Sequence, residues 1–104
     1  ESDDLISNFS TAINSFEDYV PQFREIDMEA IRKSSNFRRK RYIDAIYFGE
    51  LIENKREGQG VMKYKSGRLY EGNWKTDVRS GRGYEKYQNG NIYLGSFDLG
   101  KAHG

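Results

Sequence analysis

Cysteine is absent from the 104-residue chain, and histidine occurs only once, as His103. The lack of cysteine excludes disulfide bonds, a thiol nucleophile and a cysteine-ligated zinc site within these residues. A single histidine argues against a histidine metal cluster and a Ser-His-Asp triad, and a structural role is its simpler interpretation. The sequence therefore predicts a protein that is not an enzyme and holds no cofactor or metal.

Long hydrophobic runs are missing as well. No apolar stretch approaches the roughly 18 residues that a membrane-spanning helix requires. The first four residues are polar and acidic, unlike the start of a signal or transit peptide. From these two absences we expect a cytoplasmic protein.

Glycine and proline divide the chain into two parts. All eleven glycines lie from Gly49 onward, and the single proline, Pro21, lies in the glycine-free part. This distribution predicts a boundary near Tyr47. A helical arm with a basic linker is expected over residues 1–46, and a second unit over residues 47–104.

Charge is segregated too, although the net charge is only +1. Residues 1–31 hold eight acids and one base, whereas residues 32–42 hold six bases and no acid. Residues 43–104 hold ten bases and eight acids, so only the short middle block is strongly basic.

The first region carries helical patterns. Apolar residues at helical spacing form one stripe, whose members include Leu5, Phe9, Ile13 and Phe16. Pro21 ends this pattern, and a second helix is expected to begin at Asp27, with an apolar edge made of Ile26, Ala30 and Ile31. Because isolated helices of this length are marginal in water, we expect the stripe to bind another surface.

The basic segment, residues 32–42, includes the run Arg38, Arg39, Lys40 and Arg41. Its simplest interpretation is a solvated linker, and the alternative is a surface that binds an acidic protein, an anionic lipid or RNA. The segment has too few interleaved aromatic residues to support a dedicated nucleic-acid surface. A calmodulin-type partner or a basophilic-kinase site is indicated by a short pattern alone.

The second region is built from a repeat of 23 residues. Three series share this spacing: Tyr47, Tyr70 and Tyr93; Gly49, Gly72 and Gly95; and Gly58, Gly81 and Gly104. Leu51, Trp74 and Phe97 occupy one equivalent apolar position. The units are therefore 47–69, 70–92 and an incomplete 93–104, and the first two share eight identities in register.

Each full unit predicts two antiparallel strands. In the run Tyr70-Glu71-Gly72-Asn73-Trp74, alternate residues share one face of a strand. The pair Asn89-Gly90 is a strong signal for a tight type I′ hairpin turn, and Ser66-Gly67 is its weaker copy. Glycines on the aromatic side are expected to make room for neighbouring rings, so that stacked rings replace an aliphatic core. About five strands are expected.

The aromatic row of this sheet has two interpretations. It is either the repeat's own core, or part of it stays open as a groove for a partner's helix or extended segment. The stripe of the first helix is a further candidate for that groove. The residues concerned are Tyr47, Tyr70, Trp74, Tyr93 and Phe97.

Two other sequence patterns do not indicate nucleotide binding or acid–base catalysis. Gly58-x-Gly60 lacks the third glycine of a dinucleotide-binding loop, because Lys63 stands at that position. The carboxylates of Glu50 and Glu53 fall on polar sides or loops of the repeat, where a solvated face is the simpler interpretation.

The repeat pattern Tyr-x-Gly-x-(Trp/Phe), followed by Gly-x-Gly, an aromatic residue and an Asn-Gly turn, resembles the MORN repeat. The resemblance covers residues 47–104, with two full repeats and the opening half of a third. It implies an α+β fold, in which a short N-terminal helical arm precedes a twisted antiparallel sheet of successive hairpins. Because the sequence stops in mid-repeat, we expect a fragment of a longer array.

The same resemblance implies a non-catalytic structural or adaptor module whose partners are other protein subunits of a larger assembly. Ciliary or cytoskeletal complexes such as radial spokes are the implied setting, with a corresponding cytoplasmic location. MORN-like repeats also precede catalytic domains, as in plant phosphatidylinositol phosphate kinases and a SET-domain lysine methyltransferase. A targeting region of a larger enzyme is therefore an alternative, and binding of anionic membranes through residues 32–42 is another.

Overall fold

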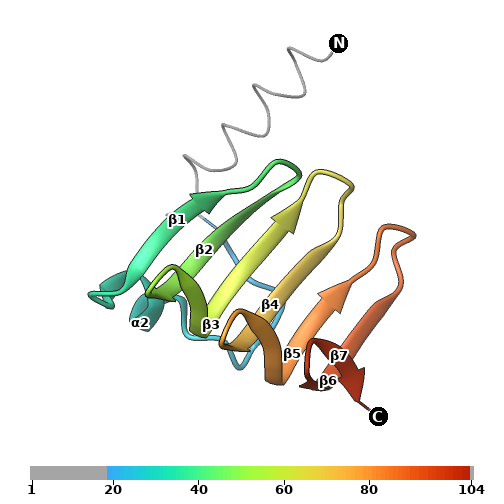
Figure 1. The fold of residues 1–104 in the computed structure, drawn as a ribbon. Helices are drawn as coiled ribbons and strands as arrows, with labels where there is room; N and C mark the ends of the chain where they lie inside the picture. Colours follow the sequence, from blue (N-terminus) through green and yellow to red (C-terminus); the bar gives the residue numbers. More distant parts are fainter. Residues whose placement is uncertain (1–18, 104) are drawn as a thin grey trace.

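The computed structural model describes residues 19–103, which form one short helix and one antiparallel sheet (Figure 1). Seven strands are hydrogen-bonded in sequence order, from β1 at one edge to β7 at the other. The elements are α2 (Met28–Lys33), β1 (Phe37–Arg41), β2 (Ala45–Ile52), β3 (Lys55–Tyr64), β4 (Leu69–Lys75), β5 (Val78–Lys86), β6 (Ile92–Asp98) and β7 (Lys101–His103). The predicted α+β class, with a sheet of successive hairpins, is confirmed. The expected first helix, with its stripe Leu5, Phe9, Ile13 and Phe16, lies outside the described residues.

The number of strands differs from the prediction of about five. The two additional strands lie at the two edges of the described sheet. β7 extends the incomplete third unit, and β1 is formed by the basic residues that were assigned to a linker. β1 pairs with β2 from Phe37 opposite Glu50 to Arg41 opposite Ile46. The sequence pattern did not indicate this strand because its side chains are mostly charged. Strand pairing requires only backbone hydrogen bonds, however, and cationic side chains are common on edge strands.

The second helix begins where the sequence predicts. Asp27 is the N-cap of α2, and its side chain accepts a hydrogen bond from the backbone N–H of Ala30 at 3.0 Å. Met28 and Ile31 are buried, whereas Ala30 is exposed, so the apolar edge differs from the expected one by one residue.

Two kinds of turn alternate along the sheet with the period of the repeat. The turns within a unit have two residues with positive φ, as in type I′ hairpins: Glu53 and Asn54, Thr76 and Asp77, Leu99 and Gly100. The turns between units are closed by a hydrogen bond from the N–H of Gly67 or Gly90 to a tyrosine carbonyl three residues earlier.

The expected hairpin at Asn89-Gly90 is therefore in place, but its predicted type is wrong. Only Gly90 of the pair has a positive φ, 93°. The connection between β5 and β6 runs over residues 87–91, which is longer than the two-residue loop of a type I′ hairpin. A turn of this length needs one left-handed residue, and glycine takes that position at low cost.

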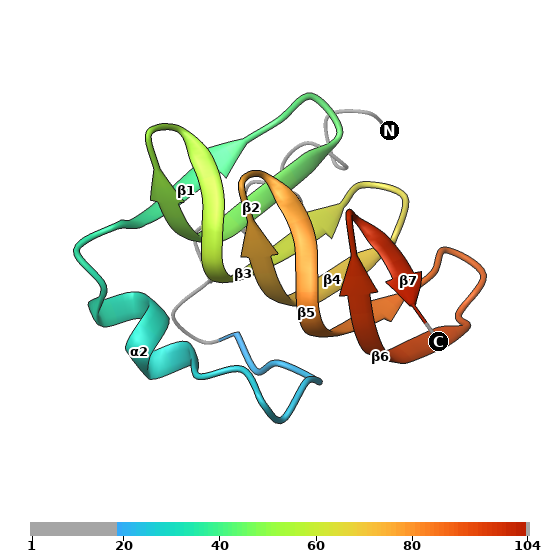
Figure 2. The ribbon, with the colours of Figure 1, turned by 60° about the horizontal axis from the view of Figure 1, so that its bottom comes forward.

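The two faces of the sheet are covered differently. Residues 19–33, here called the strap, cross one face and end in α2, as Figure 2 shows. The face beneath the strap is the strap face, and the opposite one is the aromatic face. Each has its own hydrophobic cluster.

Candidate interaction surfaces

The aromatic face is closed by a continuous ladder of rings. Tyr47, Tyr70 and Tyr93 alternate with Trp74 and Phe97, and successive rings meet edge to face with centroids 5.0 to 5.6 Å apart. Trp74 and Phe97 each lie between the tyrosine of their own unit and that of the preceding unit. Because such pairs contribute roughly 0.5–1.5 kcal/mol each beyond burial, the ladder ties one unit to the next.

Each ladder tyrosine lies against glycines. A Cβ atom added to Gly60 would be 2.3 Å from the hydroxyl oxygen of Tyr47, and one added to Gly83 would be 2.5 Å from that of Tyr70. Any larger residue would displace the ring. The prediction that glycine makes room for stacked rings is confirmed at these positions.

The hydroxyl of each ladder tyrosine is held in the same way in all three units. It donates to the carbonyl three residues later, at 2.8 to 2.9 Å: Tyr47 to Glu50, Tyr70 to Asn73 and Tyr93 to Ser96. In the first two units a β-bulge takes Glu50 out of the pairing of β2 with β3 and Asn73 out of the pairing of β4 with β5, which leaves these carbonyls available. Burial raises the pKa of the Tyr47 and Tyr70 hydroxyls far above the ordinary value, so both remain neutral donors.

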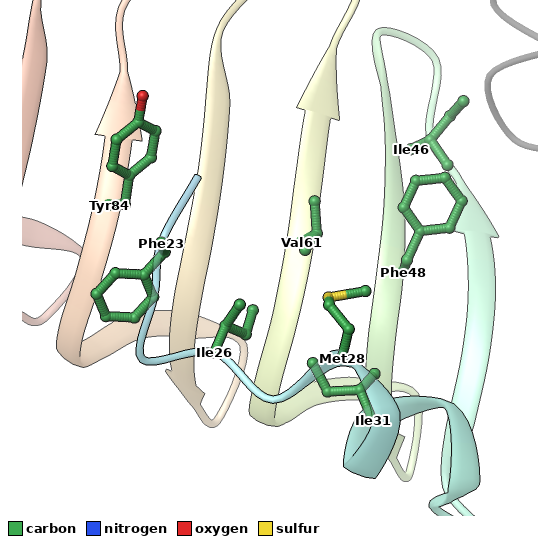
Figure 3. Packing of buried hydrophobic residues seen from close by; sticks show 8 residues of the cluster. All are labelled: Phe23, Ile26, Met28, Ile31, Ile46, Phe48, Val61 and Tyr84. Atoms are coloured by element: carbon green, nitrogen blue, oxygen red, sulfur yellow. The ribbon is translucent and has the colours of Figure 1, made fainter. Parts of the chain in front are cut away.

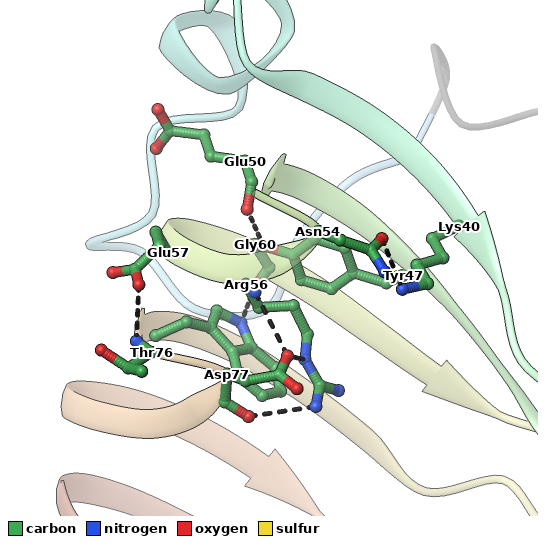
Figure 4. A network of polar contacts seen from close by, with 10 residues as sticks. Lys40, Tyr47, Glu50, Asn54, Arg56, Glu57, Gly60, Thr76 and Asp77 are labelled. Carbon is green, nitrogen blue, oxygen red and sulfur yellow. Dashed lines mark hydrogen bonds and ion pairs between the residues drawn. The ribbon is translucent and has the colours of Figure 1, made fainter. Parts of the chain in front are cut away.

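Two arginines at equivalent repeat positions pack over the ladder. The guanidinium carbon of Arg56 lies 4.6 Å from the ring centroid of Trp74, and that of Arg79 lies 5.0 Å from the centroid of Tyr70. Arg56 also donates from Nε to Oδ1 of Asp77 at 2.6 Å and from Nη2 to its carbonyl at 3.0 Å (Figure 4). Burial acts to raise the pKa of Asp77, but the hydrogen bonds that its carboxylate accepts from Nε and from the backbone N–H of Arg56 outweigh burial and hold the pKa below its ordinary value.

The ladder residues are therefore core. Tyr47 and Tyr70 are 0% exposed, Phe97 is 4% exposed and Trp74 is 5% exposed. Of the residues expected to bind a partner on this face, only Tyr93 is merely half-buried. Within residues 19–103, the packing of the four buried rings is that of the repeat's own core and leaves them no open groove.

The strap face is organised around the buried carboxylate of Glu71 on β4, which is 0% exposed. One of its oxygens accepts the backbone N–H groups of Gln22 at 2.9 Å and Phe23 at 2.8 Å, and the other accepts the hydroxyl of Tyr19. Burial and the adjacent carboxylate raise the pKa of that hydroxyl far above its ordinary value. These hydrogen bonds satisfy the buried acid, and they fix the strap through its main chain.

Apolar packing also stabilises the strap on the strap face. Four strap side chains lie over four side chains of β2, β3 and β5, and all eight are buried (Figure 3): Phe23, Ile26, Met28 and Ile31 over Ile46, Phe48, Val61 and Tyr84. Burying a side chain of this kind contributes roughly 1.5–3 kcal/mol. The strap is therefore an integral part of the folded core.

Polar contacts align the strap at its exposed side. Arg82 on β5 pairs with Glu25 through Nη2 at 2.8 Å and Nε at 3.3 Å. Gln59 on β3 accepts the N–H of Asp27 at 2.9 Å. The hydrogen bond from Arg82 holds the pKa of Glu25 below its ordinary value.

Next to the beginning of the strap, the strap face stays open. A groove of about 490 Å³ lies there. It is lined by Tyr19, Val20, Gln22, Lys63, Tyr64, Gly67, Arg68, Leu69, Tyr84, Lys86 and Ile92. Ile92 and Leu94 on β6 are each 58% exposed, and Val20 is 76% exposed. Because Leu94 pairs with Tyr84, the apolar rows of this face continue onto β6 past the strap.

The charged lining of the groove is basic. Its three ionic side chains are Lys63, Arg68 and Lys86, and no acid lines it among the described residues. Arg68 pairs with Glu85 at 2.5 Å, and Lys63 lies 5.4 Å from the ring centroid of Tyr19, whereas Lys86 is exposed. An apolar floor with a basic rim complements an acidic amphipathic segment.

The basic run on β1 does not form one flat patch. Arg38 and Lys40 stand opposite Gly49 and Tyr47 on the aromatic face, whereas Arg39 and Arg41 stand opposite residues of the strap face. The run therefore surrounds an edge of the sheet, where charge also discourages edge-to-edge pairing.

The described residues show no catalytic arrangement. Their two buried acids are both engaged: Glu71 with the strap, and Glu85 with Arg68 at 2.5 Å and Arg79 at 3.0 Å. Residues 19–103 contain no cluster of three or more His, Cys, Asp or Glu side chains able to hold a metal ion. In the same residues, no helix has the length and apolar character to span a membrane.

Sequence reasoning missed the strap face. One signal was available: Phe48, Glu71 and Leu94 are equivalent repeat positions, and an acid stands where the other two units have an apolar residue. A carboxylate at a position that faces the core indicates a specific hydrogen-bonding task. The partner of that carboxylate, the main chain of the strap, leaves no mark in the sequence.

Comparison with known proteins agrees with the repeat. The family model described as MORN repeat matches residues 47–67 and 70–92, which coincide with the first two units. β6 and β7 continue the same geometry, because Tyr93 makes the same hydroxyl contact as Tyr47 and Tyr70. No curated protein matches the chain. MORN repeats are generally non-catalytic modules that bind proteins or membranes.

Proposed function

Because residues 47–92 of this chain are MORN repeats, we propose that the chain is a non-catalytic assembly module that binds another protein through the groove of its strap face. One observation carries the proposal. The apolar rows of that face continue past the strap, so that Ile92 and Leu94 are 58% exposed beside the groove. Contiguous exposed apolar area of this kind marks interaction surfaces.

The groove also specifies the chemistry of the partner. Its lining includes the cations Lys63 and Lys86 and the apolar side chains Leu69 and Ile92, whereas the guanidinium of Arg68 pairs with Glu85, which stands opposite Tyr70. The neighbouring strap shows what this face already binds, because it presents apolar anchors together with the carboxylate of Glu25. We therefore propose an acidic amphipathic segment of another subunit as the ligand.

Mutation of the groove tests this function. The tagged full-length protein should retain its partners when unchanged and lose them when Ile92→Asp and Leu94→Asp are combined. Ile43→Asp is the matched control, because Ile43 is 93% exposed and does not line the groove. Fluorescence of Trp74, measured on the 104-residue chain, in which it is the single tryptophan, reports whether the sheet stays folded. Equal retention by the groove variant and the control would exclude the groove as the partner site.

We further propose a ciliary or cytoskeletal complex, such as a radial spoke, as the setting. Only the resemblance of the repeat supports it. The full-length protein should then remain with the detergent-insoluble cytoskeleton after extraction of cells. Complete release into the soluble fraction would contradict this setting.

A targeting region of a larger enzyme, of the phosphatidylinositol phosphate kinase or lysine methyltransferase type, is an alternative that uses the same groove. A catalytic domain elsewhere in the full-length polypeptide would distinguish it. Sequencing of the complete transcript would reveal such a domain.

Binding of anionic membranes is a second candidate function, favoured by the cations of β1. Arg38, Arg39 and Arg41 are exposed at the sheet edge. Sedimentation with phosphatidylserine vesicles should be reduced by added salt if these cations bind the lipid. Vesicle binding that does not change with salt concentration, or no binding at all, would exclude electrostatic binding to anionic membranes.

A further inference from the structure

The groove lies where an acidic segment of the same chain begins. Tyr19 and Val20, the first two described residues, both line it. Residues 1–18, which precede them, hold five acids and no base. They also carry the apolar stripe of Leu5, Phe9, Ile13 and Phe16. A segment of this composition is therefore tethered directly at the groove.

We propose that residues 1–18 occupy the groove of their own chain and compete there with the partner segment. The competition rests on the proposed function, whereas the occupancy does not. Charge supports the occupant, because the acids Glu17 and Asp18 immediately precede a groove rimmed by Lys63 and Lys86. The apolar residues of the stripe also support this occupant, since Ile92 in the groove is an exposed apolar side chain for them to pack against.

The length of the segment fits the distance it must cover. The twelve residues from Leu5 to Phe16 would span about 18 Å as a helix. Neighbouring strands are roughly 4.8 Å apart, so this length exceeds the distance from β4 to β6. A short tether gives an effective concentration in the millimolar range, which favours the attached segment over a separate partner.

Within residues 19–103, the buried rings of the aromatic face offer the stripe no open surface. Tyr47, Tyr70, Trp74 and Phe97 are buried beneath one another and the two arginines of the ladder. We therefore propose the groove of the strap face, in place of the aromatic face, as the docking site of the stripe.

Cross-linking in the cysteine-free chain tests the occupancy without any partner. The full chain would carry Asn8→Cys, beside the stripe, together with Ile92→Cys in the groove. The matched control pairs Asn8→Cys with Ile52→Cys, because Ile52 is 47% exposed and does not line the groove. Under mild oxidation the intramolecular disulfide should form at least about tenfold faster in the groove pair.

Three outcomes decide the proposal. Equal rates in the two pairs would overturn the occupancy. Lys86→Glu should slow the groove pair toward the control rate, and an unchanged rate would overturn the electrostatic match. The oxidised groove pair should capture less partner than the same protein after reduction, and equal capture would overturn the competition. If Ile92→Asp with Leu94→Asp leaves partner capture intact while the groove pair cross-links, the proposed function fails and the occupancy stands.

Discussion

The buried carboxylate of Glu71 accepts the backbone N–H of Phe23 at 2.8 Å, so one side chain of the repeat sheet holds the main chain of a segment 48 residues earlier. The same oxygen accepts the N–H of Gln22. The strap is thus attached at backbone level, and its apolar side chains are placed over the strap face by that attachment. Tyr19 and Gln22, which both donate hydrogen bonds to Glu71, also line the groove.

Removal of the Glu71 carboxylate should weaken the strap. Glu71→Ala leaves the buried N–H of Phe23 and the part-buried N–H of Gln22 without their acceptor, so we expect a loss of about 2–4 kcal/mol in the free energy of unfolding. Glu71→Gln is the matched control, because its amide oxygen can still accept both N–H groups. Urea unfolding followed by Trp74 fluorescence measures the loss. Equal losses for the two variants would contradict the role of the acceptor.

Glycine beneath the ladder should be irreplaceable for a steric reason. In Gly60→Ala the new Cβ meets the Tyr47 ring at 2.3 to 2.5 Å, and we expect a loss of about 3 kcal/mol. In Gly90→Ala the Cβ meets nothing within 4 Å, and only the positive φ of 93° is strained, at about 1–2 kcal/mol. Thermal unfolding of the two variants compares them. A larger effect at Gly90 would show that ring packing is not what fixes these glycines.

Acid should destabilise the contact between two repeats. Arg56 holds the pKa of Asp77 below its ordinary value, so the folded state favours the ionised carboxylate. The stabilisation is present above the unfolded pKa and is lost as pH falls through the folded one, between about pH 5 and pH 2. Asp77→Asn should therefore flatten this part of the stability profile, measured by urea unfolding at each pH. A variant that keeps the full acid dependence of the unchanged protein would show that other carboxylates account for it.

Within the sheet, sequence alone predicts the local structure well and the coverage of the faces poorly. The spacing of 23 residues places Tyr47 and Tyr70, their glycines and the turns at Gly67 and Gly90, because each depends on neighbours a few residues away in a repeating frame. The position of the strap on the sheet cannot be predicted in this way. Phe23 and Ile31 have no repeat counterpart, and their contacts with Tyr84 and Phe48 depend on a chain path that no local pattern encodes.

The residues of the candidate site also divide into those that a local repeat pattern predicts and those that depend on the path of the chain. The aromatic residues were found readily because they recur in phase, yet that recurrence marks the core that the repeat itself requires. Ile92 and Leu94 on β6 are exposed, whereas the side chains buried beneath the strap belong to β2, β3 and β5. Which strands the strap covers depends on the path of the chain, and the sequence of β6 does not encode that path.

Hydroxyl-radical footprinting of the full-length protein, free and in its assembly, tests the central claim most directly. In the variant Phe9→Asp with Phe16→Asp, whose own stripe no longer competes for the groove, oxidation of Ile92, Leu94 and Leu69 should fall on assembly if the strap-face groove is the interaction surface, while that of Trp74 and of the exposed Ile43 stays unchanged. Protection confined to the aromatic face or to β1, with the groove residues as reactive as before, would contradict it.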